Sequence, residues 1–335
     1  MSVGTDLQRA VDILSAGGVI AFPTETVYGL GADAERAEAV ARIFAIKQRP
    51  RAHPLIVHLA PEASLDDWAI EIPDVARRLT AAAWPGPLTV ILRRGPRASL
   101  VATGGGDTIG LRVPANPMAK ALLRLFGGGI AAPSANRFGA VSPTTAAHVV
   151  ADLGDDVLYV LDGGPCDVGL ESTIVDLSRD RAVLLRPGGL AREAIEAITG
   201  PLAAADAAAP AAPGTLASHY APRARVIAVA PHEVPAAVAG ARANDGASQR
   251  TLASGARIAV LAPASAFAAW PGLRAEAHPL PDDAAGMARA LYAALRDLDA
   301  AGVDVVIAAL PEAAGLGEAV GDRLLRAAGP RKDEP

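Results

Sequence analysis

The chain contains 335 residues, which is more than one typical domain needs, so we expect two domains that each bury their own core. The 31 basic and 36 acidic side chains give a net charge of −5, which argues against a protein that coats nucleic acid, and the single cysteine excludes an intrachain disulfide and a thiolate metal cluster. The sequence shows neither a signal-peptide pattern nor a run of about 18 apolar residues, so we expect a cytoplasmic enzyme of the reducing compartment, with no membrane anchor.

The first 200 residues alternate between amphipathic helices and short apolar runs. Thr5 and Gln8 have the spacing of a capping box, and Leu7, Val11 and Leu14 follow on one helical face. The same alternation predicts further helices near 34–47, 73–83, 117–126 and 144–152, and strands at 19–22, 54–59, 88–92, 108–113, 157–161, 173–177 and 182–186. Helices interleaved with β-branched runs indicate an α/β or α+β sheet domain over residues 1–200.

Residues 201–222 interrupt this alternation. Alanine and proline dominate the segment, and proline cannot support the interior of a regular element, so we expect a linker there. A second α/β unit is then expected over residues 223–335, with strands at 225–229, 257–262 and 303–310 and helices near 283–300 and 317–328. Strands that recur with helical crossovers are typical of a small Rossmann-like domain.

The segment PTETVYGLGAD, residues 23–33, follows the first predicted buried strand. It gathers two threonines, a glutamate, a tyrosine and two glycines at the carboxyl end of that strand, where α/β sheets place their ligands. A well-capped turn, with glycines for backbone geometry, explains the same residues equally simply. The segment is therefore a candidate site that local pattern alone does not decide.

The next candidate is KQRPRAHPLIVH, residues 47–58. Lys47 and Arg49 leave a predicted helix end just before a proline, and such a pair can clamp a polyphosphate. Only three of the 31 basic residues are lysines, which favours a specific need for a compact ammonium at Lys47. A solvated basic helix C-terminus is the competing interpretation. His58 lies in the strand on the side opposite Leu55 and Val57, which weakly favours a functional role.

Polar residues also interrupt later apolar runs. Arg112 lies inside a strand, where an unpartnered guanidinium would be costly, so it needs an anionic partner or ligand. Ser134 and Asn136 follow a strand end and precede a helix start, an arrangement that can bind anions. Ser142, followed by a proline, is explained as a plain N-cap, but that interpretation leaves Ser134 and Asn136 unexplained.

No single nucleotide or metal motif is present. The sequence has no G-x-x-x-x-G-K-[ST] loop, no H-E-x-x-H and no paired C-x-x-C. GLGEAVG, residues 315–321, misses the dinucleotide-binding spacing by one residue, so we expect glycine-assisted packing there rather than a cofactor site.

Several of these strings occur together in one order. PTETVYGLGAD, KQRP, HPLIVH, WPGPLTVIL, TIGLRVP, APSAN, SPT, GLEST, LLRPG and HYAP closely resemble the YrdC-type L-threonylcarbamoyl-AMP synthases. The resemblance is dense over residues 5–222, and the two-domain length is similar to the long form of that family. It implies a YrdC-like twisted open sheet domain with flanking helices, followed by a smaller Rossmann-like α/β domain.

The resemblance also implies an activity. A member of this family converts L-threonine, bicarbonate and ATP to threonylcarbamoyl-AMP and pyrophosphate, with Mg²⁺ on the phosphates. The product passes to a tRNA threonylcarbamoyl transferase, which modifies the adenosine beside the anticodon. We therefore expect weak or no direct tRNA binding, no resident metal and no membrane partner.

Family similarity assigns roles to residues by position. The phosphate-handling, catalytic residues would be Lys47, Arg49, Ser134 and Asn136. Threonine would be bound by Thr26, His58, Arg112 and Ser172. ATP would be bound by Arg49, His53, Thr108, Ser134, Asn136, Ser142, Arg186 and Tyr220.

The resemblance also predicts a role for the linker, and the chain departs from the family pattern at two positions. His219 and Tyr220 in the linker are expected to close over the site and to shield a labile carbamate from water. The chain departs from common family patterns in having His53 where relatives have asparagine, and in lacking a lysine before HYAP.

The sequence was also compared with three alternative functions. The basic residues around 42–51 and 93–97 could form an RNA-binding patch. Carbamoyl-adenylate chemistry, as in hydrogenase maturation proteins, would require zinc fingers that one cysteine cannot supply. A regulatory YrdC paralogue without activity is disfavoured by the intact Lys47, Arg49, Ser134 and Asn136.

Overall fold

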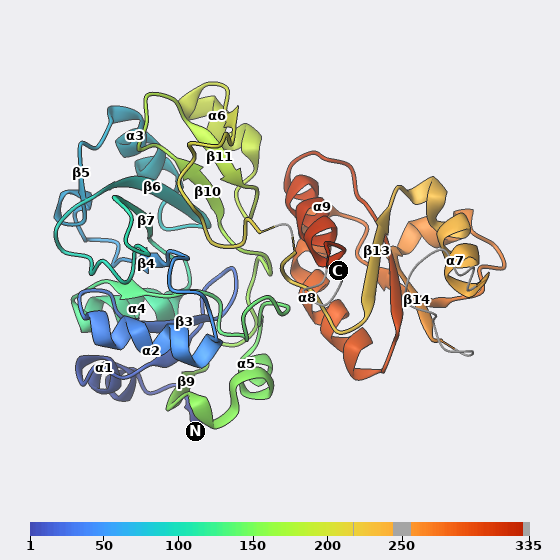
Figure 1. Cartoon of the computed structure of the whole chain (residues 1–335), viewed down its shortest axis with the longest axis horizontal. Helices are drawn as coiled ribbons and strands as arrows, with labels where there is room; N and C mark the ends of the chain where they lie inside the picture. The colour runs from blue at the N-terminus through green and yellow to red at the C-terminus, as the bar shows by residue number, and fades with distance from the viewer. Residues whose placement is uncertain (217, 244–255, 331–335) are drawn as a thin grey trace. The chain divides into compact units, whose positions relative to one another are not determined.

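A computed structural model describes residues 1–216, 218–243 and 256–330 (Figure 1). The chain divides into two compact units. The first comprises Met1–Phe138 and Ser142–Thr215, and the second comprises Gly139–Val141 and the residues from Leu216 onward. Within the described ranges, no helix has both the length and the apolar character that crossing a membrane requires.

A mixed sheet forms the centre of the first unit. Its strands are β1 (Ser2–Gly4), β2 (Ile20–Phe22), β3 (Gly29–Asp33), β4 (Ile56–His58), β5 (Ala69–Ile70), β6 (Leu88–Arg94), β7 (Thr108–Arg112), β8 (Ile130–Ala131), β9 (Tyr159–Leu161), β10 (Thr173–Asp176), β11 (Val183–Arg186) and β12 (Ala203–Ala204). They are ordered β1-β9-β2-β3-β8-β4-β7-β6-β10-β11-β12, and β5 pairs with β6. The functionally important pairing is the parallel one between β4 and β7, with antiparallel β8 on the other side of β4.

Helices cover both faces of this sheet. They are α1 (Leu7–Ser15), α2 (Ala37–Lys47), α3 (Asp74–Ala83), α4 (Pro117–Phe126), α5 (Ala146–Leu153) and α6 (Arg192–Thr199). Apolar residues of α1 and α4 pack together with β2 and β8 in one core cluster. Those of α2, α3, α5 and α6 belong to a second, larger cluster. The sheet is therefore buried on both sides, as its apolar strands require.

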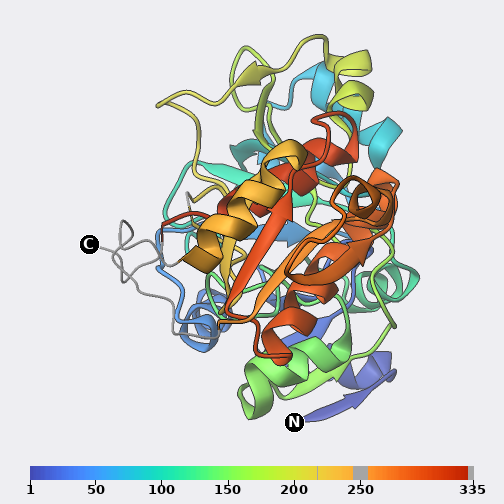
Figure 2. The ribbon, with the colours of Figure 1, turned by 90° about the vertical axis from the view of Figure 1, so that its right-hand side faces the viewer.

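The second unit is a smaller parallel sheet with helices on both faces. Its strands, β13 (Arg225–Val229), β14 (Ile258–Pro263), β15 (Glu276–Leu280) and β16 (Val305–Ala309), are ordered β13-β16-β14-β15, and every adjacent pair is parallel. Helix α7 (Val234–Ala243) lies in front of this sheet in Figure 2, and α8 (Ala284–Ala300) and α9 (Leu316–Ala327) pack on each other behind it. The predicted Rossmann-like domain is confirmed, as is the open-sheet domain before it.

Several local predictions need correction. The cap of α1 is Asp6, whose carboxylate accepts from the Arg9 N–H at 3.1 Å, so the proposed capping box at Thr5 and Gln8 is wrong by one residue. Strand β3 lies inside the segment read as a site loop. Its sequence, GLGAD, lacks β-branched residues, and a Cβ at Gly31 would lie 2.7 Å from the Ile130 side chain. This close packing explains why residue 31 is glycine. Because the glycines replace the β-branched residues typical of strands, the sequence did not predict β3.

The predicted linker, residues 201–222, includes both regular and irregular structure. β12 pairs in parallel with β11, with Ala203 opposite Val183. The contact boundary between the two units falls further on, between Thr215 and Leu216. The sheet of the first unit therefore extends into the predicted linker, and the division between the units falls later within it.

The cap of α1 gives a stability prediction. Asp6→Ala should lower the free energy of unfolding of the first unit by about 1 kcal/mol, because it leaves an N-terminal N–H of the helix without its acceptor. Chemical denaturation followed by tryptophan fluorescence measures it. Thr5→Ala is the matched control and should leave the midpoint unchanged; equal losses for the two variants would restore the capping box.

Candidate active site

Lys47 lies at the centre of the predicted phosphate-handling group. Helix α2 ends at Lys47, and its ammonium donates to the carbonyl of Ser134 at 2.5 Å, to the carbonyl of Asn136, and to Asn136 Oδ1 at 3.3 Å. Ser134 Oγ also donates to Asn136 Oδ1 at 2.5 Å. The structure thus brings Lys47, Ser134 and Asn136, which family similarity assigned to one role, into direct contact.

Backbone pairing puts these partners in place. The Ala135 N–H donates to the Tyr28 carbonyl at 2.8 Å, and the Leu30 N–H donates to the Pro133 carbonyl at 2.8 Å. The segment that carries Ser134 is therefore held against the start of β3. Two motifs more than 100 residues apart in the chain become one wall of the site.

The Lys47 ammonium is buried, with 2% of the residue exposed. Burial, and next the positive charge of Arg49, hold the pKa of Lys47 well below its ordinary value. Among the described residues its hydrogen-bond acceptors are carbonyl and amide oxygens rather than carboxylates. A buried ammonium without a bonded carboxylate is suited to an anionic ligand.

Arg49 and His53 form a second group beside Lys47. Gln48 adopts a left-handed conformation at the end of α2, which turns the chain so that Arg49 Nη2 donates to the Pro54 carbonyl at 3.1 Å. The Arg49 guanidinium lies 5.4 Å from the centre of the Phe138 ring, and the His53 ring packs edge-on against the same ring at 5.5 Å. Burial, and then Arg49, lower the pKa of His53.

His58 and Arg112 form the third group. They are opposite each other on the parallel strands β4 and β7, so both side chains leave the same face of the sheet. Both residues are buried, and His58 Nδ1 and Arg112 Nε have no hydrogen-bond partner among the described residues. Burial, and then the Arg112 charge, lower the pKa of His58 to about 3, so its imidazole is neutral. Two unsatisfied buried nitrogens at one level of the sheet mark a position for a ligand.

Glu25 is the functional residue that the sequence did not single out. Arg112 Nη2 donates to Glu25 Oε1 at 2.7 Å, and the Ala115 N–H donates to Glu25 Oε2 at 3.0 Å. The sequence predicted either a partner or a ligand for Arg112, and the structure supplies a partner. Glu25 is the only acid between Pro23 and Tyr28, which is the signal that could have found it.

Thr26 and Cys166 flank this ion pair. Thr26 Oγ1 hydrogen-bonds Thr24 Oγ1 at 2.8 Å within the same buried loop. Cys166 is buried, and burial, followed by the negative charge of Glu25, raises the pKa of its thiol to about 12. A hydroxyl and a carboxylate of this loop thus lie near the thiol of Cys166.

Ser172 and Arg186 lie on neighbouring strand segments. Ser172 Oγ hydrogen-bonds Thr89 Oγ1 at 2.8 Å, and Arg186 Nη2 donates to the Ser172 carbonyl at 2.8 Å. Arg186 Nη1 also reaches the Pro213 carbonyl at 2.8 Å. Ser172, predicted for threonine, and Arg186, predicted for the nucleotide, are therefore in contact.

Ser142 is not a helix cap. The cap of α5 is Thr145, whose side chain accepts from the His148 N–H. The Ser142 hydroxyl instead donates to Glu171 Oε1 at 2.6 Å, and both residues are buried. The plain-cap interpretation of Ser142 is therefore wrong, because its hydroxyl binds the Glu171 carboxylate instead.

Two predicted nucleotide residues are not among these groups: Thr108 is at the far end of its strand, and Tyr220 is in the other unit. Thr108 begins β7 opposite Arg93, at the other end of that strand from Arg112. Tyr220 belongs to the second unit, where its ring stacks on Tyr292 with centroids 5.8 Å apart. Tyr220 has φ 61° and is 1% exposed.

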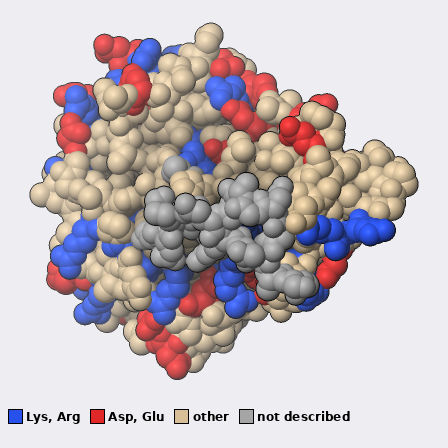
Figure 3. All heavy atoms as spheres, turned by 45° about the vertical axis from the view of Figure 1, so that its right-hand side comes forward, with Lys and Arg blue, Asp and Glu red and all other residues tan. Residues whose placement is uncertain are grey.

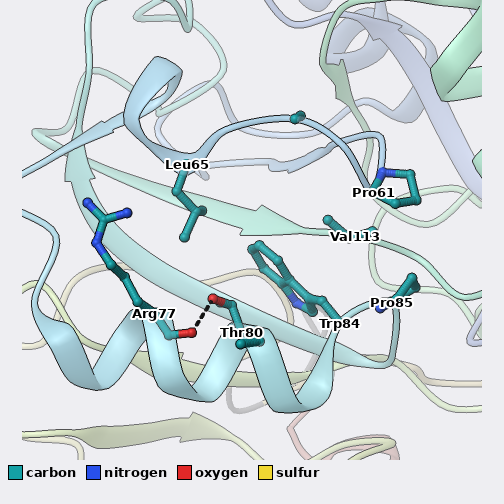
Figure 4. Close-up of a pocket in the computed structure, with 9 residues that line it drawn as sticks. Pro61, Leu65, Arg77, Thr80, Trp84, Pro85 and Val113 are labelled. Atoms are coloured by element: carbon teal, nitrogen blue, oxygen red, sulfur yellow. Dashed lines mark hydrogen bonds between the residues drawn. The ribbon is translucent and has the colours of Figure 1, made fainter.

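A separate pocket of about 310 Å³ is lined by residues of α3 and by Val113, just after β7 (Figure 4). Leu65, Trp84 and Pro85 give it apolar walls, and Val113, the residue after Arg112, also lines it. Arg77 at its edge is already paired with Asp66 at 2.6 Å. The pocket adjoins the site without containing the residues described above.

Known proteins match this chain over nearly its full length. A family model for Sua5, YciO and YrdC proteins, described as "Telomere recombination", matches residues 12–188, and "Threonylcarbamoyl-AMP synthase, C-terminal domain" matches residues 190–329. The threonylcarbamoyl-AMP synthase of Pyrococcus abyssi is 41% identical over 97% of this chain and 94% of its own, and that of Bacillus subtilis is 38% identical over 97% and 93%. The crystal structure of P. abyssi Sua5 complexed with L-threonine matches with a TM-score of 0.88 and 37% identity over 98% of both chains.

The fold and the site define the chain as a YrdC-like α/β enzyme. More particularly, it belongs to the threonylcarbamoyl-AMP synthase family, in the long form that carries a second domain. The resemblance seen in the sequence motifs is confirmed.

His58 gives a pH prediction. The unfolded chain takes up a proton on His58 as the pH falls through about 6.5, whereas the folded protein resists protonation until about pH 3. The free energy of unfolding therefore decreases with falling pH in this window because of His58, and His58 contributes nothing to the dependence above it. His58→Gln should weaken the dependence between pH 7 and 4, measured by denaturation midpoints. His232→Gln, at an exposed histidine, should keep the wild-type slope; parallel slopes for all three proteins would contradict the assignment.

Proposed function

We propose that this site joins L-threonine, bicarbonate and ATP to give threonylcarbamoyl-AMP and pyrophosphate. The observation that carries the proposal is the buried Lys47 ammonium, held on the carbonyls of Ser134 and Asn136 beside the Arg49 guanidinium. Whole-length similarity to enzymes named for this product supports it. The structure of a relative complexed with L-threonine supports that amino acid as a substrate.

The chemistry divides into two steps. The threonine ammonium first loses a proton to solvent, and the neutral amine then attacks the carbon of bicarbonate, so that a C–N bond forms, water leaves and a carbamate results. A carbamate oxygen then attacks the α-phosphorus of ATP, and the bond to the β-phosphate oxygen breaks to release pyrophosphate. The protein supplies position and positive charge rather than a covalent intermediate, and Lys47 and Arg49 provide that charge.

Each group of side chains has a proposed task. Arg112 receives the carboxylate of threonine, and the neutral His58 imidazole, with Thr26 and Ser172, receives its hydroxyl. Polar groups that only a hydroxyl-bearing substrate satisfies would discriminate against alanine or valine. The nucleotide is assigned to Arg49, His53, Thr108, Ser134, Asn136, Ser142, Arg186 and Tyr220.

Mg²⁺ enters the proposal only with ATP. Among the described residues, no group of three or more histidine, cysteine or acidic side chains could hold a metal ion. The ion is therefore assigned to the phosphates of the substrate, where it offsets their charge, and no protein ligand is assigned to it.

The wider role follows from the same reaction. The product would pass, in the cytoplasm, to a tRNA threonylcarbamoyl transferase, with residues 201–222 linking the two domains. The competing function, an RNA-binding paralogue, would need a basic surface. On the face seen in Figure 3, Lys and Arg side chains are interspersed with Asp and Glu, which favours the small-molecule enzyme.

Pyrophosphate release by the purified protein tests the function. We expect release from ATP to require both L-threonine and bicarbonate, and L-alanine not to replace threonine. Lys47→Ala should lower kcat/KM by about 100-fold or more, because a preorganised charge is lost. Lys120→Ala, at a lysine on α4, is the matched control and should keep wild-type activity. Release that proceeds without threonine would overturn the assignment.

The role assigned to Tyr220 has its own test. Tyr220→Ala should reduce pyrophosphate formation and shorten the lifetime of the adenylate, whereas Tyr220→Phe should keep the ring and most of both properties. Quenched-flow measurement of the adenylate gives the lifetime. Unchanged formation and lifetime in the alanine variant would remove Tyr220 from the site.

A further inference from the structure

The ion pair between Glu25 and Arg112 determines the charge of one corner of the site. The side chains of Arg112 and Glu25 are 4% and 6% exposed, and Arg112 Nη2 lies 2.7 Å from Glu25 Oε1. The Glu25 backbone is also fixed, because its carbonyl accepts from the Val168 N–H at 2.8 Å. Glu25 thus holds one edge of the guanidinium from a rigid loop.

Glu25 is the carboxylate that compensates Arg112 within the described part of the chain. The neighbouring His58 imidazole is neutral, so it adds no charge. We call Arg112, Glu25 and His58 the corner of the site. Because the positive charge of Arg112 is matched by the negative charge of Glu25, this corner carries a net charge near zero. Its unsatisfied atoms are Arg112 Nε and His58 Nδ1, which leaves hydrogen-bonding capacity without excess charge.

A neutral corner with separated charges selects among ligands. A simple carboxylate that approaches Arg112 is attracted by the guanidinium and repelled by Glu25, so much of the attraction cancels in a low-dielectric site. A zwitterion gains from both groups, because its ammonium can lie toward the carboxylate of Glu25 while its carboxylate faces Arg112. The arrangement therefore discriminates by the ligand's own charge distribution.

We propose that Glu25 is a specificity-determining residue: it holds Arg112 in place and cancels its charge, so that the site takes an amino-acid zwitterion and rejects a simple carboxylate anion. The inference rests on the proposed function, in which Arg112 receives the carboxylate of threonine. It adds a residue and a selection rule to that function.

The test compares threonine with its α-hydroxy analogue, 2,3-dihydroxybutanoate, which is a monoanion without an amine and can only inhibit. The measured quantity is the ratio of the inhibition constant of the analogue to the KM of threonine in pyrophosphate release. In the wild-type protein this ratio should exceed about 10. Glu25→Gln should raise the KM of threonine and lower the ratio about tenfold, because Arg112 then attracts any carboxylate. Glu25→Asp, which keeps the charge, should restore most of the ratio.

Asp176→Asn is the matched control. Asp176 is fully buried on β10 and is paired with Arg179 at 2.9 Å, so its loss also removes a buried carboxylate from an arginine. This variant should leave the ratio unchanged, because general destabilisation affects both ligands equally. The ratio is thus a measurement that a purely structural role for Glu25 would not move.

The outcomes separate the two proposals. If wild-type pyrophosphate release does not depend on threonine, the proposed function fails. If release depends on threonine but the wild-type ratio is near 1, or Glu25→Gln leaves the ratio unchanged, the inference alone is wrong. Where the glutamine variant does not fold, a wild-type ratio near 1 still overturns the inference, and Glu25→Asp, which keeps the charge, should still keep most of a high ratio.

Discussion

Removing a cation from water is costly unless oxygen atoms replace the water, and the first unit buries four cationic side chains in this way. Lys47 is satisfied by Ser134 and Asn136, and Arg112 by Glu25. Arg49 and Arg186 donate to backbone carbonyls. The acceptor of Arg49 lies in its own segment, but those of Lys47, Arg112 and Arg186 come from other segments, so the requirement for oxygens ties separate loops to one another. This constraint positions those three cations and their partners.

The same constraint relates stability to activity. A buried ammonium with a lowered pKa, held only by neutral oxygens, is a group that the fold tolerates rather than one that strengthens it. The Lys47 ammonium becomes favourable when an anionic substrate binds, because the substrate supplies the negative charge that the neutral oxygens lack. Sites of this kind hold their charges in place before the reaction begins, so little reorganisation is needed at the moment of bond formation.

The sequence predicted the fold wherever pattern and burial coincide. The strands with apolar, β-branched residues, such as β6 and β16, and helices with a clear apolar face, such as α4 and α8, lie where expected. Strand β3 and helix α7 were missed, because one is rich in glycine and the other in alanine, and their order comes from tertiary packing. The cap at Asp6 differs from the predicted one by a single residue, which is the usual uncertainty of a helix boundary.

The site was predictable to a similar extent. The rarity of lysine singled out Lys47, and the cost of an arginine in a strand singled out Arg112. The partner of Arg112 could not be chosen, because Glu25 is 87 residues away and only the sheet topology brings the two together. The partner of Ser142, Glu171, was hidden for the same reason.

The surroundings of Cys166 have a consequence for the durability of the enzyme. The thiolate is the form of cysteine that oxidants and alkylating agents attack, and a thiol with a pKa of about 12 supplies almost none of it at neutral pH. Cys166 is the only cysteine in the chain, and it is buried. Burial and a raised thiol pKa therefore make Cys166 a poor target for such reagents.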